Sequence, residues 1–204
     1  MKNYAKGLFL AGGLSLLSGC MAVTPTKETI VSYKIYDVKV SDELKAKDVT
    51  SAVANALREY SSEVRINNNI PPHPLPEKAG RFQLKNPFSN SNLGALAAAQ
   101  GSSMKIPFCE EALMTANAAD NSFGKYGENT MFYTCVWAYS EGYHVDIYTS
   151  FSIASGGFNA ATLGASLARN VVGDSRKFIP RTIEKIVSNL EETGAEVTLV
   201  EEYP

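Results

Sequence analysis

The clearest pattern of hydrophobic and polar positions lies in the middle of the chain. An alternating run extends from Asn129 to Tyr139, and a second one extends from Tyr143 to Ala154. Alternation is typical of a β-strand because successive side chains point to opposite faces of the sheet. The connection Ser140-Glu141-Gly142 is short and contains glycine. The two runs are therefore predicted to form a β-hairpin with one buried side and one wet side.

Helical spacing predicts two amphipathic helices that flank this hairpin in the sequence. The first covers Val49 to Tyr60, with Asp48 as its cap, or with a start one or two turns earlier at Ser41 or Asp42. The second contains Ile179 to Leu190, and Gly194 is expected to end it as a left-handed cap. A third helix, rich in small residues, is predicted from Asn159 to Val172.

The remaining elements complete an α+β fold. Further strands are predicted at Ile30–Val40, Val64–Ile66, Arg81–Lys85, Ala112–Ala118 and Glu196–Glu201. Asn67–Pro76 is too rich in proline for a regular element and is interpreted as a surface connection, with a polyproline recognition strip as the alternative. We therefore expect a mostly antiparallel sheet with helices packed on one face.

The first twenty residues have the pattern of an export signal. Lys2 and Lys6 precede a short apolar run from Gly7 to Leu17, and the run ends in Leu17-Ser18-Gly19-Cys20. The apolar run is too short for a membrane span, which needs about 20 residues. The closing tetrapeptide resembles the lipobox of bacterial lipoproteins.

This resemblance implies a lipid on Cys20 and predicts the domain organisation. Residues 1–19 are expected to be a cleaved signal, residues 20–29 a lipidated tether, and residues 30–204 a single periplasmic domain. Met21 stands where an Asp would favour inner-membrane retention in the enteric version of this class. We therefore expect an outer-membrane anchor with the domain on the periplasmic side, although surface exposure stays open.

The cysteine content agrees with this location. With Cys20 committed to lipid, Cys109 and Cys135 remain, and neither belongs to a Cys-x-x-Cys motif. An even number of cysteines in an oxidising compartment predicts a disulfide. Two buried free thiols, or one catalytic cysteine, are the alternatives.

Composition and charge exclude one class of partner. The chain is 45% hydrophobic and 20% charged, as in an ordinary globular protein, and its formal charge is −2. Nucleic acid binding needs a concentrated basic face, so we expect no nucleic acid partner.

No motif predicts catalysis, a metal site or a cofactor. The two histidines, His73 and His144, have no metal-ligand spacing. His144 and Asp146 share one strand face, as a base and its orienting residue would, but an ordinary half-exposed histidine is the simpler interpretation. Ser166 lies in a Gly-x-Ser sequence within a helical pattern, without the second glycine of a nucleophile elbow. Enzymatic activity is the weaker hypothesis.

The hairpin also carries a group of aromatic residues suited to binding. The candidate binding surface comprises Tyr133, Trp137, Tyr139, Tyr143 and Tyr148. Tyrosine and tryptophan are frequent interface anchors, but packing in the core and in cross-strand pairs is the favoured role for these residues. The leading hypothesis is a non-enzymatic lipoprotein that contacts an envelope protein partner. A ligand-binding or inhibitor module for a glycan or an enzyme is the alternative, and a hydrolase comes after both.

Overall fold

The structure is a computed structural model, which describes residues 26–41, 45–89, 91–92, 105–122, 124, 128–155 and 177–204. Its strands are β1 (Thr26–Lys39), β2 (Glu63–Asn68), β3 (Gln83–Lys85), β4 (Ile106–Phe108), β5 (Met114–Asp120), β6 (Asn129–Tyr139), β7 (Gly142–Ser155) and β8 (Glu196–Tyr203), and its helices are α1 (Ala46–Tyr60) and α4 (Phe178–Glu192). Cys20 and the predicted helix Asn159–Val172 lie outside the described residues.

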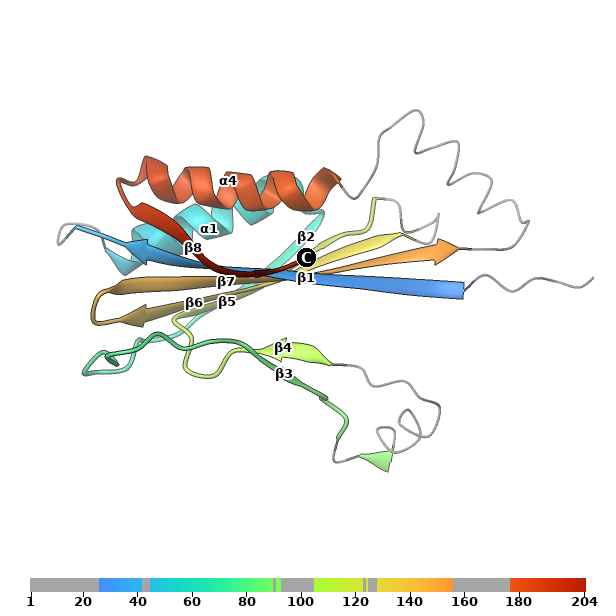
Figure 1. Cartoon of the computed structure of the whole chain (residues 1–204), viewed down its shortest axis with the longest axis horizontal. Helices are drawn as coiled ribbons and strands as arrows, with labels where there is room; N and C mark the ends of the chain where they lie inside the picture. Colours follow the sequence, from blue (N-terminus) through green and yellow to red (C-terminus); the bar gives the residue numbers. More distant parts are fainter. Residues whose placement is uncertain are drawn as a thin grey trace, which may run out of the picture.

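Six of the strands form one antiparallel sheet in the order β2-β5-β6-β7-β1-β8. In Figure 1 the helices α1 and α4 lie above this sheet, and the short pair β3-β4 lies below it. The prediction of a mostly antiparallel sheet with helices and one disulfide is confirmed. No helix among the described residues is long and apolar enough to cross a bilayer.

The predicted hairpin is the centre of the sheet. β6 has the predicted bounds, and β7 begins one residue earlier than predicted, at Gly142. Gly142 has a φ of 149°, and a Cβ atom there would lie 2.4 Å from the carbonyl oxygen of Val38. Only glycine fits this turn, because it alone accepts both the backbone conformation and the close approach.

The upper face of the sheet, which carries Phe132, Val136, Val145 and Ile147, shares one hydrophobic cluster with the helices. The fully buried helical members of this cluster include Val53, Leu57, Ile186 and Leu190. Burying a side chain of this size contributes about 1.5–3 kcal/mol, so this cluster is the main source of stability. The apolar residues at helical spacing in the sequence are therefore the ones that α1 and α4 contribute to this cluster.

The helix ends agree only partly with the sequence. α1 begins at Ala46, so Asp48 is inside the first turn and is not the cap as predicted. The Asp48 carboxylate instead accepts a hydrogen bond from the backbone N–H of Lys45 at 3.1 Å. A carboxylate in the first turn suits the free N–H groups and the positive end of the helix dipole. Gly194, with a φ of 87°, follows α4 in the predicted left-handed conformation.

The lower face, which carries Tyr33, Trp137, Asp146 and Tyr148, differs from the prediction of a wet side. Residues 69–82, here called the strap, run across this face between β2 and β3. The backbone of Ser140 donates to the carbonyl oxygen of Pro76 at 2.9 Å and fixes the strap to the hairpin turn. Trp137, Asp146 and Tyr148 are consequently buried. The prediction of one wet side is wrong because a proline-rich connection acts as a second layer.

Candidate functional site

The five aromatic residues predicted as a binding surface do not form one surface. Tyr133, Trp137 and Tyr139 lie at alternate positions of β6 on the lower face, and Tyr148 of β7 pairs directly with Tyr133. Tyr143 pairs with Ala138 and packs against the hydrophobic cluster of the upper face. The structure therefore brings four of the five together and places Tyr143 on the opposite side.

Trp137 belongs to a small core beneath the strap. Its side chain is only 3% exposed, and its indole N–H donates to the carbonyl oxygen of Glu110 at 3.0 Å. The Cys109–Cys135 disulfide lies in the same cluster, which confirms the predicted bridge. A Cβ on Gly80 of the strap would lie 2.3 Å from the indole nitrogen, so the strap backbone touches the ring. Trp137 is thus committed to packing.

Tyr148 is held by aromatic contacts with the strap. The Phe82 ring lies 5.7 Å from the Tyr148 ring and 5.3 Å from the Tyr33 ring, both edge to face. Tyr148 is 6% exposed, and burial raises the pKa of its hydroxyl. Pairs of this geometry add about 0.5–1.5 kcal/mol beyond area burial. Phe82 therefore locks the strap onto the sheet.

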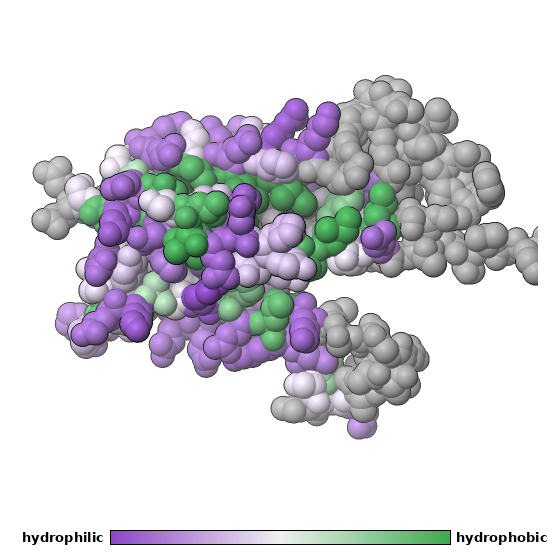
Figure 2. Space-filling model, viewed as in Figure 1, coloured by the Kyte–Doolittle hydropathy of each residue, from purple (hydrophilic) through white to green (hydrophobic). Residues whose placement is uncertain are grey.

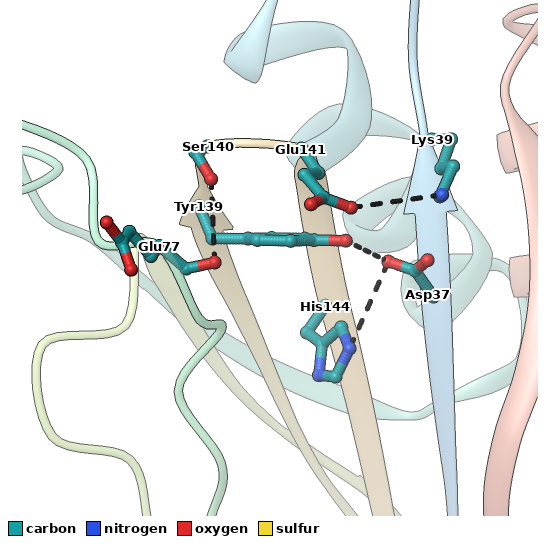
Figure 3. Close-up of polar contacts among 7 residues, drawn as sticks. All are labelled: Asp37, Lys39, Glu77, Tyr139, Ser140, Glu141 and His144. Carbon is teal, nitrogen blue, oxygen red and sulfur yellow. Dashed lines mark hydrogen bonds and ion pairs between the residues drawn. The ribbon is translucent and has the colours of Figure 1, made fainter.

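Tyr139 belongs to a cluster of polar side chains near the hairpin turn (Figure 3). Its hydroxyl donates to an Asp37 carboxylate oxygen at 2.6 Å, and His144 Nε2 lies 3.9 Å from the same oxygen. Burial, followed by the hydrogen bond to Asp37, raises the pKa of Tyr139. Burial lowers the pKa of His144, although Asp37 acts in the opposite direction. His144 therefore faces Asp37 of β1, a residue that the sequence analysis did not single out.

Asp146 is the most unusual carboxylate of the lower face. It is 1% exposed, and one oxygen accepts a hydrogen bond from the backbone N–H of Phe82 at 3.1 Å. The other oxygen is buried without a partner in the described part of the chain. Burial raises the pKa of Asp146 to about 7, while the Phe82 hydrogen bond and Arg81 act in the opposite direction. No contact joins Asp146 to His144 among the described residues, so the base-and-orienter arrangement lacks a hydrogen bond.

Of the four lower-face aromatics, Tyr139 lines a hollow at the hairpin turn, and Tyr133 lines two hollows farther along β6. One hollow of about 340 Å³ and another of about 430 Å³ both reach Tyr133 and Asn117, beside the strap. Side chains from β2, β5 and β6 form their floor. The sequence analysis named Tyr133 but none of the asparagines around it.

A separate surface lies along β8, the edge strand of the sheet. Leu199, Val200 and Tyr203 are exposed, by 42%, 55% and 54%. A groove of about 340 Å³ lies between β1 and α4, with Tyr36 and Ile183 among its lining residues. Figure 2 shows hydrophobic residues gathered along α4 and β8 on this side. Exposed apolar side chains close to an apolar groove make this side a candidate contact site.

Comparisons with known proteins supply no family. No protein-family model matches the chain, and a search of curated proteins found no match. Among the described residues, no group of three or more histidine, cysteine, aspartate or glutamate side chains is placed to hold a metal ion. Function must therefore be argued from these surfaces.

Proposed function

We propose that this protein is a lipid-anchored outer-membrane lipoprotein whose domain faces the periplasm and contacts a partner protein of a cell-envelope assembly. It acts by binding, without catalysis. The observation that carries this proposal is the open edge of β8 beside an apolar groove. The lipobox resemblance at Cys20 and the Cys109–Cys135 bridge support a location in an oxidising compartment.

The β8 edge offers backbone groups to a partner. β8 pairs with β1 on one side and has no other strand neighbour within the described ranges. An edge strand presents unpaired N–H and C=O groups, and an extended segment of another protein can add to it as a further strand. Leu199 and Val200 would then contact the apolar side chains of that segment.

The charges beside the edge specify the chemistry of the partner. Glu184 and Glu191 line the groove and form no ion pair within the described part of the chain. Lys34, the basic residue of the groove lining, is paired with Glu202. Complementary charge favours a partner segment that carries Lys or Arg beside its apolar residues.

In this proposal, the helices and the strap leave only part of the sheet accessible to a partner. We take both helices to cover the upper face and the strap to cover half of the lower face. The two edge strands of the six-stranded sheet are β2 and β8, and we take the edge of β8, the longer of the two, as the partner surface.

Site-specific crosslinking tests the partner surface. A photoreactive amino acid at Val200 should capture a stoichiometric envelope protein at native expression, and Glu184→Lys with Glu191→Lys should reduce the yield. The same photoreactive group at Leu84, which is 44% exposed on β3, is the matched control. Equal capture at both positions, or none at Val200, would contradict the proposed surface.

The anchor has its own test. Mass spectrometry of the native protein should show an amino-terminal Cys20 that carries lipid, and Cys20→Ser should release the protein from membranes. An intact leader or an unmodified Cys20 would contradict the proposed location.

A further inference from the structure

The two hollows at Tyr133 are neighbours on the lower face. They share Tyr133 and Asn117, and their volumes are about 340 and 430 Å³. Each volume falls within the roughly 300–1,000 Å³ typical of small-ligand sites. Their arrangement offers two adjacent subsites rather than one.

Strand register concentrates polar side chains in this feature. Arg65 of β2 pairs with Asn117 of β5, and Asn117 pairs with Tyr133 of β6, so the three form a row across the sheet. Positions two residues away on the same strands face the same side. The carboxamides that line the two hollows are those of Asn67, Asn69, Asn117, Asn121 and Asn129.

Much of the hydrogen-bonding capacity of these groups is unused. The side chains of Asn67 and Asn117 make no hydrogen bond to other described residues. The Asn129 Oδ1 atom is buried without a partner in the described ranges. Among the described residues, the Tyr133 hydroxyl has the Met131 sulfur as its one hydrogen-bond partner, at 3.8 Å. The exposed carboxamides of Asn67 and Asn117 can therefore form hydrogen bonds with a ligand without giving up bonds to other described residues.

The charge of the hollows selects a neutral ligand. Their charged lining residues are Glu63 and Arg65, and these two form an ion pair with each other. A carboxamide offers both donors and an acceptor, which matches the hydroxyl group, itself a donor and an acceptor. The Tyr133 ring adds an apolar platform beside them, as amphipathic aromatic side chains do in binding sites.

We propose that these hollows bind a neutral oligosaccharide, with consecutive sugar units in the two subsites. Carboxamides of β2, β5 and β6 bind the hydroxyl groups, and the Tyr133 ring packs against the apolar face of a sugar ring. This site is separate from the β8 edge, so a lipoprotein could hold a partner protein and a glycan at once.

Binding to defined oligosaccharides tests the proposal. The full mature protein is titrated in detergent with tetramers of glucose, N-acetylglucosamine, galactose and mannose, and with a galacturonic acid tetramer as a charged probe. We expect saturable binding of at least one neutral tetramer by calorimetry, and weaker binding of the charged one. Asn117→Ala should weaken that binding about tenfold, because it removes ligand hydrogen bonds without breaking a hydrogen bond between described side chains.

Asn55→Ala is the matched control, because Asn55 is an exposed carboxamide on α1, away from both hollows. It should leave the affinity unchanged. No saturable binding of any neutral tetramer, or equal weakening by both variants, would overturn the proposal. A peptide of alternating serine and glycine that binds at Asn117, where no sugar does, would overturn it and assign the site to an extended peptide.

Discussion

Two halves of the lower face carry the same kinds of residue and have different roles. Tyr148 and Tyr133 are direct cross-strand neighbours with ring centroids 6.2 Å apart. Tyr148 lies under Phe82 of the strap and is 6% exposed, whereas Tyr133 is half-buried and lines two hollows. The strap decides which aromatic stabilises the fold and which can contact a ligand. Residue type and strand position alone do not make this distinction.

The largest expected difference in stability is between two single variants, in which either Tyr148 or Tyr133 is replaced by alanine. Tyr148→Ala should lower the free energy of unfolding by about 3–5 kcal/mol, because it leaves a cavity beneath Phe82. Tyr133→Ala should cost about 1–2 kcal/mol, because its ring is already partly in water. Urea denaturation of both variants measures the difference.

Both substitutions remove the same Tyr133–Tyr148 contact, so each is a control for the other. Equal losses of stability would mean that the strap adds nothing to Tyr148. That result would contradict the division of the face into a covered half and an open half.

The covered half should also carry a pH dependence that the open half lacks. The pKa of Asp146 is raised from 3.8 to about 7 by burial, so the folded state holds a proton that the unfolded chain releases. Between those pH values the contribution of Asp146 to stability must therefore fall as pH rises, by roughly 4 kcal/mol at most. Below about pH 4 both states are protonated, and above about pH 7 both are ionised, so the slope disappears at either end.

Asp146→Asn isolates this contribution. The variant keeps an oxygen for the Phe82 N–H and removes the charge, so it should gain stability over the wild type as pH rises from about 4 to about 7. The lowered pKa of His144 destabilises both proteins as pH falls below 6.5, and it cancels in the comparison. Urea midpoints across this range measure the gap, and a gap that does not change with pH would contradict a buried Asp146.

The sequence predicts elements better than it predicts layers. β6 and the end of α4 follow from local pattern: alternation from Asn129 to Tyr139, and a glycine at position 194. The coverage of Trp137 and Tyr148 depends on Gly80 and Phe82 of a proline-rich connection, whose path no local period encodes. Long-range placement of irregular backbone is set by tertiary contacts.

The candidate site shows the same limit. Asn67, Asn117 and Asn129 are far apart in the sequence and on three different strands, so only the strand register brings them together. Once β2-β5-β6 pairing is known, their positions on the lower face follow from alternation. The sequence gives no sign of that pairing order.

The disulfide lies between the open half and the covered half of the lower face. Cys135 of β6 lies between Tyr133 and Trp137 along the lower face, and its bridge to Cys109 closes a 26-residue separation. Replacing both cysteines with serine should lower the free energy of unfolding by about 3.5 kcal/mol in the chain-entropy model. Urea denaturation with and without reductant measures this loss. Reductant should destabilise the wild type and leave the double variant unchanged; identical unfolding of wild type and variant would contradict the assignment.

The smallest expected loss of stability comes from a substitution in the strap. Gly80→Ala places a methyl group within 2.4 Å of two Trp137 ring atoms, so the strap or the ring must move. Overpacking of this kind costs about 1–3 kcal/mol. Trp137 is the chain's single tryptophan, so its fluorescence should shift to longer wavelength as water reaches the ring.

Gly124→Ala is the matched control, since among the described residues its Cβ would meet the Asn121 Cβ at 3.9 Å, an ordinary contact distance. It should change stability by less than about 0.5 kcal/mol. The more informative comparison is oligosaccharide affinity in the Gly80→Ala protein. Of the carboxamides that line the hollows, Asn69 alone belongs to the strap, at its first position, so that affinity should stay close to the wild-type value while the Trp137 emission changes. A parallel loss of both would mean that the strap shapes the hollows as well, and the two halves of the face would then be one cooperative unit.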